Sequence, residues 1–169
     1  MYEYSIAIFR HSLRSLARLV RKGAAYAAEQ NIPPEELLDT RLAPDMFTLA
    51  QQVRGVSYHA RAAAANLTGE VAPEYDGEPA SFTELLAEID ETLEWLDALP
   101  AARLAGAETR EITLELRRGP VRFDGRRYLA HFVLPNFFFH LTTAYDILRH
   151  CGVAVGKADF LGDFKAITR

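Results

Sequence analysis

Three polar side chains that could take part in chemistry lie at helical spacing in an apolar segment near the end of the chain. Asn136, His140 and Thr143 are four and then three residues apart, so they share one side of a helix. The rest of the segment 134–152 is strongly apolar. Burying a polar group without a partner costs roughly 1–3 kcal/mol. The segment therefore predicts either an internal hydrogen-bond cluster or a ligand-binding site.

A second histidine is placed to join this group. The chain has five histidines: His11, His59, His131, His140 and His150. His59 borders the apolar stripe of a helix expected over 45–68, whereas His131 and His150 lie off the face of the last helix that carries His140. Neutral imidazole is a good ligand for zinc, nickel or iron. His59 and His140 are therefore the pair expected to meet inside a bundle.

Composition indicates a single folded domain and argues against nucleic-acid binding, disulfides and thiolate-based zinc sites. The chain has 169 residues, of which 49% are hydrophobic, and a net charge of −4, so we expect one domain over 1–169 with a substantial core. Acidic residues dilute the arginine-rich stretch 111–127, so nucleic acid is not an expected partner. The single cysteine, Cys151, excludes an intrachain disulfide and a thiolate-built zinc site. We interpret it as a packing residue.

The chain shows neither a secretory signal at its start nor a long apolar run. No such run approaches the ~18–20 residues that span a bilayer. We therefore expect a cytoplasmic protein without a membrane partner.

Hydrophobic periodicity predicts four long helices. Asp45 is a candidate N-cap for the second, Gly69 its C-terminal stop, and Ser81-Phe-Thr-Glu84 has the capping-box spacing that opens the third. Pro135 either starts or kinks the fourth. The expected helices cover 4–29, 45–68, 81–99 and either 128 or 135 to 151, with a short turn at 35–38 and an irregular tail over 153–169.

The segment between the third and fourth helices predicts a small β-hairpin. Residues 111–116 alternate with period two, and 121–123 are placed to pair back across a Gly-Pro turn. The connections before the second and third helices are longer than antiparallel neighbours need, so at least one crossover is expected. The fold prediction is an all-α four-helix bundle with a hairpin before the last helix.

Several motifs spread over nearly the whole chain resemble the DinB/YfiT-like superfamily of metalloenzymes and, within it, a family defined by a domain of unknown function. The motifs that carry the resemblance are Asp45-Met-Phe-Thr-Leu-Ala50 with Gln52-Val53, Ser81-Phe-Thr-Glu-Leu85, Leu134-Pro-Asn-Phe-Phe-Phe-His140, Thr143-Ala-Tyr-Asp-Ile-Leu-Arg-His-Cys-Gly152 and Gly156-Lys-Ala-Asp-Phe-Leu-Gly162. They are specific for the narrow family and much weaker indicators of an activity. The resemblance implies the bundle fold and a homodimer.

The resemblance also implies a divalent-metal site of three histidines, one on the second helix and two spaced by four on the fourth. Here the resemblance assigns His59 and His140 as metal ligands. Asn136 occupies the position of the third histidine ligand, and Thr143 would support the ligands without binding the metal. An amide oxygen is a weaker ligand than imidazole. The metal would be zinc, nickel, manganese or iron.

Two functions remain open from the sequence. One is a metal-dependent transferase or hydrolase with a degenerate His/Asn/His site, acting on an unknown small molecule; thiol transfer is the best-known chemistry among relatives. The other is a metal-free dimeric bundle that binds or scaffolds without catalysis, in which Asn136, His140 and Thr143 satisfy one another. The departure at Asn136 favours the second.

Overall fold

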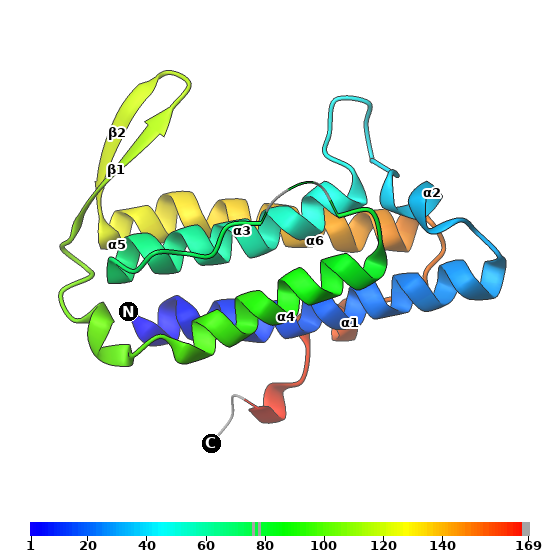
Figure 1. Ribbon diagram of the computed structural model, residues 1–169, viewed down its shortest axis with the longest axis horizontal. Helices are drawn as coiled ribbons and strands as arrows, with labels where there is room; N and C mark the ends of the chain where they lie inside the picture. Colours follow the sequence, from blue (N-terminus) through cyan, green and yellow to red (C-terminus); the bar gives the residue numbers. More distant parts are fainter. Residues whose placement is uncertain (76, 78, 167–169) are drawn as a thin grey trace.

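Four long helices form the body of the protein in a computed structural model that describes residues 1–75, 77 and 79–166. They are α1 (Ile6–Gln30), α3 (Leu49–Thr68), α4 (Phe82–Ala98) and α6 (Leu134–His150). Figure 1 shows α1 and α6 running in one direction and α3 and α4 in the other. The connection from α3 to α4 therefore runs along the bundle, which confirms the predicted all-α fold with a crossover.

The β-hairpin before the last helix is also confirmed. Strands β1 (Glu111–Leu116) and β2 (Gly119–Asp124) pair antiparallel, with Glu111 opposite Asp124 and Leu116 opposite Gly119. The hairpin projects from one end of the bundle (Figure 1). The remaining short elements are η1 (Tyr2–Tyr4), α2 (Pro34–Leu38), η2 (Ala101–Leu104), α5 (Gly125–Arg127), the π-helical η3 (Tyr128–Val133), α7 (Lys157–Leu161) and η4 (Phe164–Ala166).

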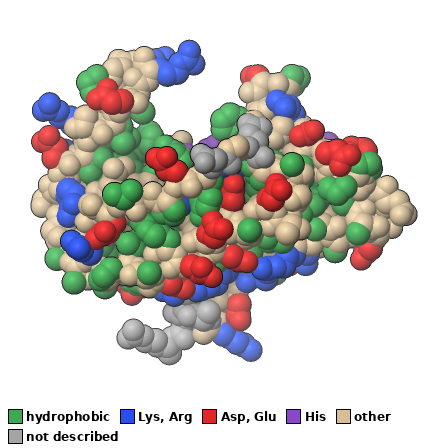
Figure 2. Space-filling view, viewed as in Figure 1, with side chains coloured by type: hydrophobic (Ala, Val, Ile, Leu, Met, Phe, Trp, Pro, Cys, Tyr) green, Lys and Arg blue, Asp and Glu red, His purple; other side chains and the backbone are tan. Residues whose placement is uncertain are grey.

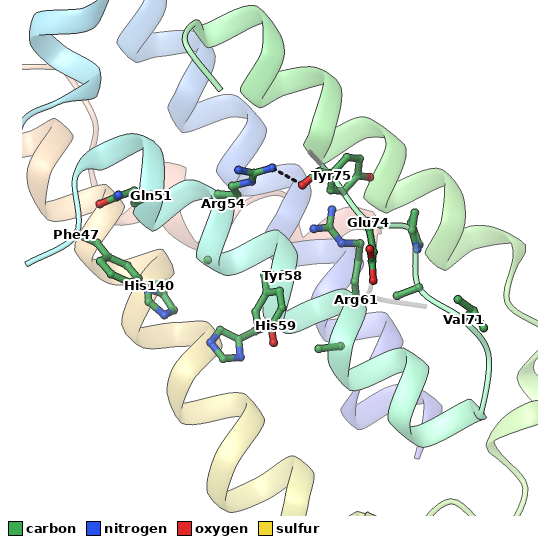
Figure 3. Close-up of a pocket in the computed structure, with 14 residues that line it drawn as sticks. Phe47, Gln51, Arg54, Tyr58, His59, Arg61, Val71, Glu74, Tyr75 and His140 are labelled. Carbon is green, nitrogen blue, oxygen red and sulfur yellow. Dashed lines mark hydrogen bonds between the residues drawn. The ribbon is translucent and has the colours of Figure 1, made fainter. Parts of the chain in front are cut away.

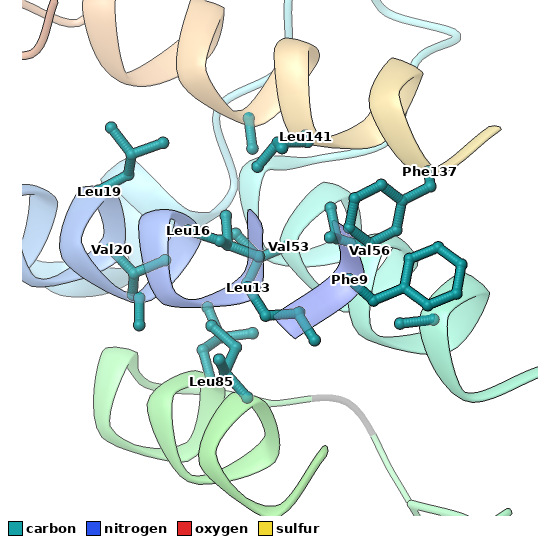
Figure 4. Close-up of a cluster of buried hydrophobic side chains, with 14 of the residues drawn as sticks. Phe9, Leu13, Leu16, Leu19, Val20, Val53, Val56, Leu85, Phe137 and Leu141 are labelled. Atoms are coloured by element: carbon teal, nitrogen blue, oxygen red, sulfur yellow. The ribbon is translucent and has the colours of Figure 1, made fainter. Parts of the chain in front are cut away.

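The core fills the space between the four long helices. The apolar stripe of α1 faces inward, and Figure 4 shows it meeting side chains from α3, α4 and α6. Phe9 and Phe137, both fully buried, have ring centroids 5.1 Å apart. This packing fixes α3 against α6, which are the two helices that carry the candidate histidines.

Helix α3 begins at Leu49, four residues later than the sequence predicted. Its N-cap is Thr48, whose hydroxyl accepts from the Gln51 backbone at 3.3 Å while the Gln51 side chain accepts from the Thr48 backbone at 3.1 Å. This reciprocal capping box satisfies two backbone donors, whereas Asp45 lies in the preceding turn. The predicted stop at Gly69 is confirmed by its left-handed φ of 80°.

The last helix is continuous with the π-helical turn before it, so Pro135 lies in its first turn without a break. A π turn shifts backbone bonding to carbonyls five residues back, and proline supplies no N–H. Carbonyls in this turn therefore need another donor. Asn136 provides one, because its side-chain nitrogen donates to the Phe132 carbonyl at 2.6 Å.

The tail is more regular than predicted. Helix α7 packs against α1, where Asp159 forms an ion pair of 2.7 Å with Lys22 and also caps the backbone N–H of Gly156 at 2.9 Å. A helix this short gives almost no periodicity signal, so its tertiary partner decides its structure. The end of the predicted irregular tail, residues 167–169, lies outside the described residues. In the described ranges, no helix has the length and hydropathy of a membrane span.

Candidate functional site

The packing of α3 against α6 brings His59 and His140 together, as the sequence predicted. Their rings are nearly parallel, at 19°, with centroids 5.2 Å apart. Phe47, from the loop before α3, stacks on the other side of His140 at 5.9 Å. The two imidazoles therefore form a mixed aromatic stack on the outer face of α3.

The close approach of His140 to α3 depends on a glycine. An ideal Cβ on Gly55 would lie 2.9 Å from the His140 Cγ and 3.0 Å from its Nδ1, well inside the ~3.5–4.0 Å of ordinary carbon contacts. Gly55 thus leaves a notch in the helix surface that the imidazole ring occupies.

Gln52 determines which ring nitrogen of neutral His140 carries the proton. The Gln52 side-chain nitrogen points to the Phe47 carbonyl at 3.4 Å, so its Oε1 faces the His140 Nδ1 at 2.7 Å. An amide oxygen only accepts, and this network therefore assigns the proton to Nδ1. The Nε2 of neutral His140 then carries a lone pair that can accept a proton, a hydrogen bond or a metal ion.

Burial keeps both imidazoles neutral at pH 7. Desolvation, and secondly the nearby His140, lowers the pKa of His59 from 6.5 to about 4. Desolvation also lowers the pKa of His140. The site therefore presents two uncharged nitrogen bases rather than two cations.

These histidines line one end of a cavity of about 780 Å³ between α3, α6 and the crossover segment 71–75. Figure 2 shows the molecule hollowed between the β-hairpin and the loop before α3. In Figure 3, His59 and His140 lie at one end of this cavity and Arg54, Arg61 and Tyr75 at the other. The volume suits a small organic molecule.

The opposite end of the cavity is built from charged side chains that hold the crossover segment. Arg54 donates to the Tyr75 carbonyl at 3.0 Å and pairs with Glu88 of α4 at 3.2 Å. The guanidinium of Arg61 lies 3.7 Å from the centroid of the Tyr75 ring. Arginines from α3 thus attach the segment 71–75 over the cavity.

Asn136 and Thr143 are placed differently from the two histidines. The Thr143 hydroxyl donates to the Phe139 carbonyl at 2.7 Å, and the Asn136 amide nitrogen donates to Phe132 as described above. Both bonds satisfy the backbone of their own helix. Among the described residues, the cavity wall includes His59 and His140 and leaves out Asn136 and Thr143.

The donor set fits a metal only in part. Two imidazoles bound through nitrogen to one tetrahedral zinc, at about 2.0–2.1 Å, have centroids roughly 5 Å apart, close to the separation of His59 and His140. The described residues contain no group of three or more His, Cys, Asp or Glu side chains able to hold an ion. With its amide nitrogen bonded to Phe132, Asn136 could offer only an amide oxygen. The residues therefore do not fit a metal with three strong protein ligands.

Sequence reasoning missed three residues that shape the site: Gln52, Gly55 and Arg61. Helical spacing could have found the first two, because Gln52, Gly55 and His59 follow one another at three and four residues along one face of α3. Arg61 gives no such signal, since a single arginine in a helix is normally solvated.

Comparisons with known proteins agree with this architecture. The family model "Domain of unknown function (DUF1993)" matches residues 1–161. A crystal structure of a DinB family member protein from Shewanella denitrificans is 34% identical, covers 96% of this chain and 92% of that chain, and superposes with a TM-score of 0.88. Among curated proteins, none matches. The chain therefore belongs to the DUF1993 family and has a DinB-like fold.

Proposed function

We propose that this protein binds a small molecule in the cavity between α3, α6 and the segment 71–75, and that His59 and His140 contact it as neutral imidazoles without a resident metal. The observation that carries this proposal is the hydrogen bond from His140 to Gln52. It orients a buried imidazole and leaves its Nε2 as a base beside a cavity of about 780 Å³.

The other features of the site support the same function. The cavity wall combines the aromatic residues Phe47, Tyr58 and Tyr75 with a few polar groups, which is the usual make-up of small-molecule sites. Lowered pKa values hold His59 and His140 uncharged at neutral pH. The ligand should therefore present a hydrogen-bond donor toward the histidines.

A fragment screen by NMR on uniformly labelled protein tests the proposal. Binders should shift signals from His59, His140 and Tyr58, and His140→Gln should weaken them about tenfold or more. His131→Gln, which changes an exposed histidine outside the cavity, is the matched control. Fragments that bind elsewhere, or that bind wild type and His140→Gln equally, would contradict the proposal.

The second candidate is the metal-dependent transferase or hydrolase of the sequence prediction, with His59, His140 and Asn136 as ligands. The observation that favours it is the 5.2 Å separation of the two ring centroids, which two imidazole ligands of one tetrahedral ion also show. The near-parallel stacking of the rings counts against it, because two rings bound to one ion are parallel only when they are coplanar. It requires at least one further ligand from solvent or substrate. Metal content and fragment binding distinguish the two candidates, because only the second predicts an ion lost with His140.

A further inference from the structure

Arg61 is a buried cation in the cavity wall. Its residue is 6% exposed, its Nη1 donates to the Thr92 hydroxyl at 3.2 Å, and its guanidinium face covers the Tyr75 ring. No carboxylate lies within ion-pairing distance of it in the part of the chain that the structure describes. A buried charge without a counter-ion is costly, so this position calls for an anionic partner.

The nearest carboxylate is already engaged. Glu88 pairs through Oε1 with Arg54 at 3.2 Å, and its Oε2 is buried without a hydrogen-bond partner among the described residues. Burial also raises the pKa of Glu88 above its ordinary value. Glu91, also on α4, acts electrostatically on Arg61 but is exposed to solvent. Among the described residues, Arg54 and Arg61 thus contribute two positive charges near one partly buried carboxylate, that of Glu88. Glu74, at the cavity wall, is exposed to solvent and largely screened.

We propose that Arg61 binds an oxyanion, a carboxylate or a phosphate, on the small molecule held in this cavity, so that the ligand is an organic acid whose far end reaches His59 and His140. This inference rests on the function proposed above and adds the chemical class of the ligand. A guanidinium offers a planar fork of donors that matches such a group.

The wall between the two ends suits the rest of such a molecule. Tyr58 lies between the histidine pair and the arginines in Figure 3, whereas Tyr75 and Val71 line the arginine end of the same cavity. Ring faces and aliphatic groups favour an apolar or aromatic body. An aromatic acid therefore matches the cavity better than a small inorganic anion.

Calorimetric titration with benzoate, phenyl phosphate and benzamide tests the inference, because benzamide keeps the shape of benzoate without its charge. We expect an oxyanion probe to bind wild type about tenfold or more tightly than benzamide, and that preference to disappear in Arg61→Met. Arg117→Met, on the exposed hairpin, is the matched control and should bind as wild type does. Whichever acid binds more tightly, benzoate or phenyl phosphate, shows whether the site prefers a carboxylate or a phosphate.

A buried arginine can also support the fold, so Arg61→Lys is measured beside Arg61→Met, with thermal unfolding of both. The lysine variant keeps the charge without the fork and should bind oxyanions with intermediate affinity. Equal binding of benzoate and benzamide, oxyanion binding that survives in a folded Arg61→Met, or no binding of either acid at millimolar concentration would overturn the inference.

His140→Gln separates this inference from the proposed function. If His140→Gln binds the two acids as tightly as wild type does, and Arg61→Met binds them more weakly, the arginine subsite stands and the histidine role fails. If binding needs His140 but shows no preference for acids, the proposed function stands and the oxyanion inference fails.

Discussion

Replacing Gly55 by alanine should displace the His140 ring while leaving the bundle folded. The new Cβ would lie 2.9–3.1 Å from three atoms of the imidazole, whereas carbon atoms normally pack at about 3.5–4.0 Å. The ring must therefore move by roughly 0.5–1 Å. The 2.7 Å bond from Nδ1 to Gln52 would then lengthen to roughly 3.2–3.7 Å, which weakens or breaks it.

Three terms, one favourable and two unfavourable, set the free energy of unfolding of Gly55→Ala. Alanine in a helix interior is favoured over glycine by roughly 0.5–1 kcal/mol. Overpacking costs about 1–3 kcal/mol, and the lost hydrogen bond adds about 0.5–1.5 kcal/mol. The free energy of unfolding should therefore fall by roughly 0.5–4 kcal/mol, a range too wide to identify the contact by itself.

The decisive assay is therefore ¹⁵N NMR of the histidine rings at pH 7. Wild type should show His140 as the Nδ1–H tautomer, and Gly55→Ala should show a mixture of tautomers. Gly23→Ala is the control, because its Cβ would crowd Leu148 at 2.8 Å, far along α6 from the histidine. An unchanged Nδ1–H signal in a Gly55→Ala protein that is stabilised by about 1 kcal/mol would refute the notch.

Other substitutions test separate parts of the account. Because folding lowers the pKa of His59 from 6.5 to about 4, the unfolded chain binds more protons in that interval, so stability should fall as pH drops from 6.5 toward 4. His59→Gln should remove up to roughly 3 kcal/mol of that pH dependence in urea titrations, and an unchanged dependence would contradict the lowered pKa of His59. Asn136→Ala should lower the free energy of unfolding by about 1 kcal/mol, because the Phe132 carbonyl loses its donor. A loss of the same size in the free energy of fragment binding would contradict a purely structural role for Asn136. Thr48→Ala should cost about 1 kcal/mol through its cap, which thermal unfolding checks; no loss would contradict the cap. Sedimentation measures the homodimer that the resemblance implies, and a monomer would contradict it.

The fold was largely predictable because long amphipathic segments carry a strong period. Helices α1, α3 and α4 and the hairpin pairing follow directly from the spacing of apolar residues. The predicted start of α3 was wrong because both Asp45 and Thr48 are suitable N-cap residues. Thr48 caps the helix, since it forms a reciprocal pair of hydrogen bonds with Gln51. Helix α7 was missed because a five-residue helix is not stable by itself and depends on its contacts with α1, among them the ion pair between Asp159 and Lys22.

The site was less predictable than the fold. Helical spacing brought His59 and His140 together correctly, since both lie on packed faces of adjacent helices. The same spacing placed Asn136 with them, but its amide nitrogen is held by the π-helical turn, which no periodicity reports. Arg61 became a candidate only when its burial and its missing counter-ion among the described residues were visible.

The most direct test is the metal content of tag-free wild type beside His140→Ala, by elemental mass spectrometry after reconstitution with zinc, nickel, manganese and iron. The account predicts substoichiometric metal in both proteins, because the described residues offer two imidazoles and no third strong ligand. Near-stoichiometric metal in wild type that disappears in His140→Ala would contradict it and establish the metal-dependent alternative.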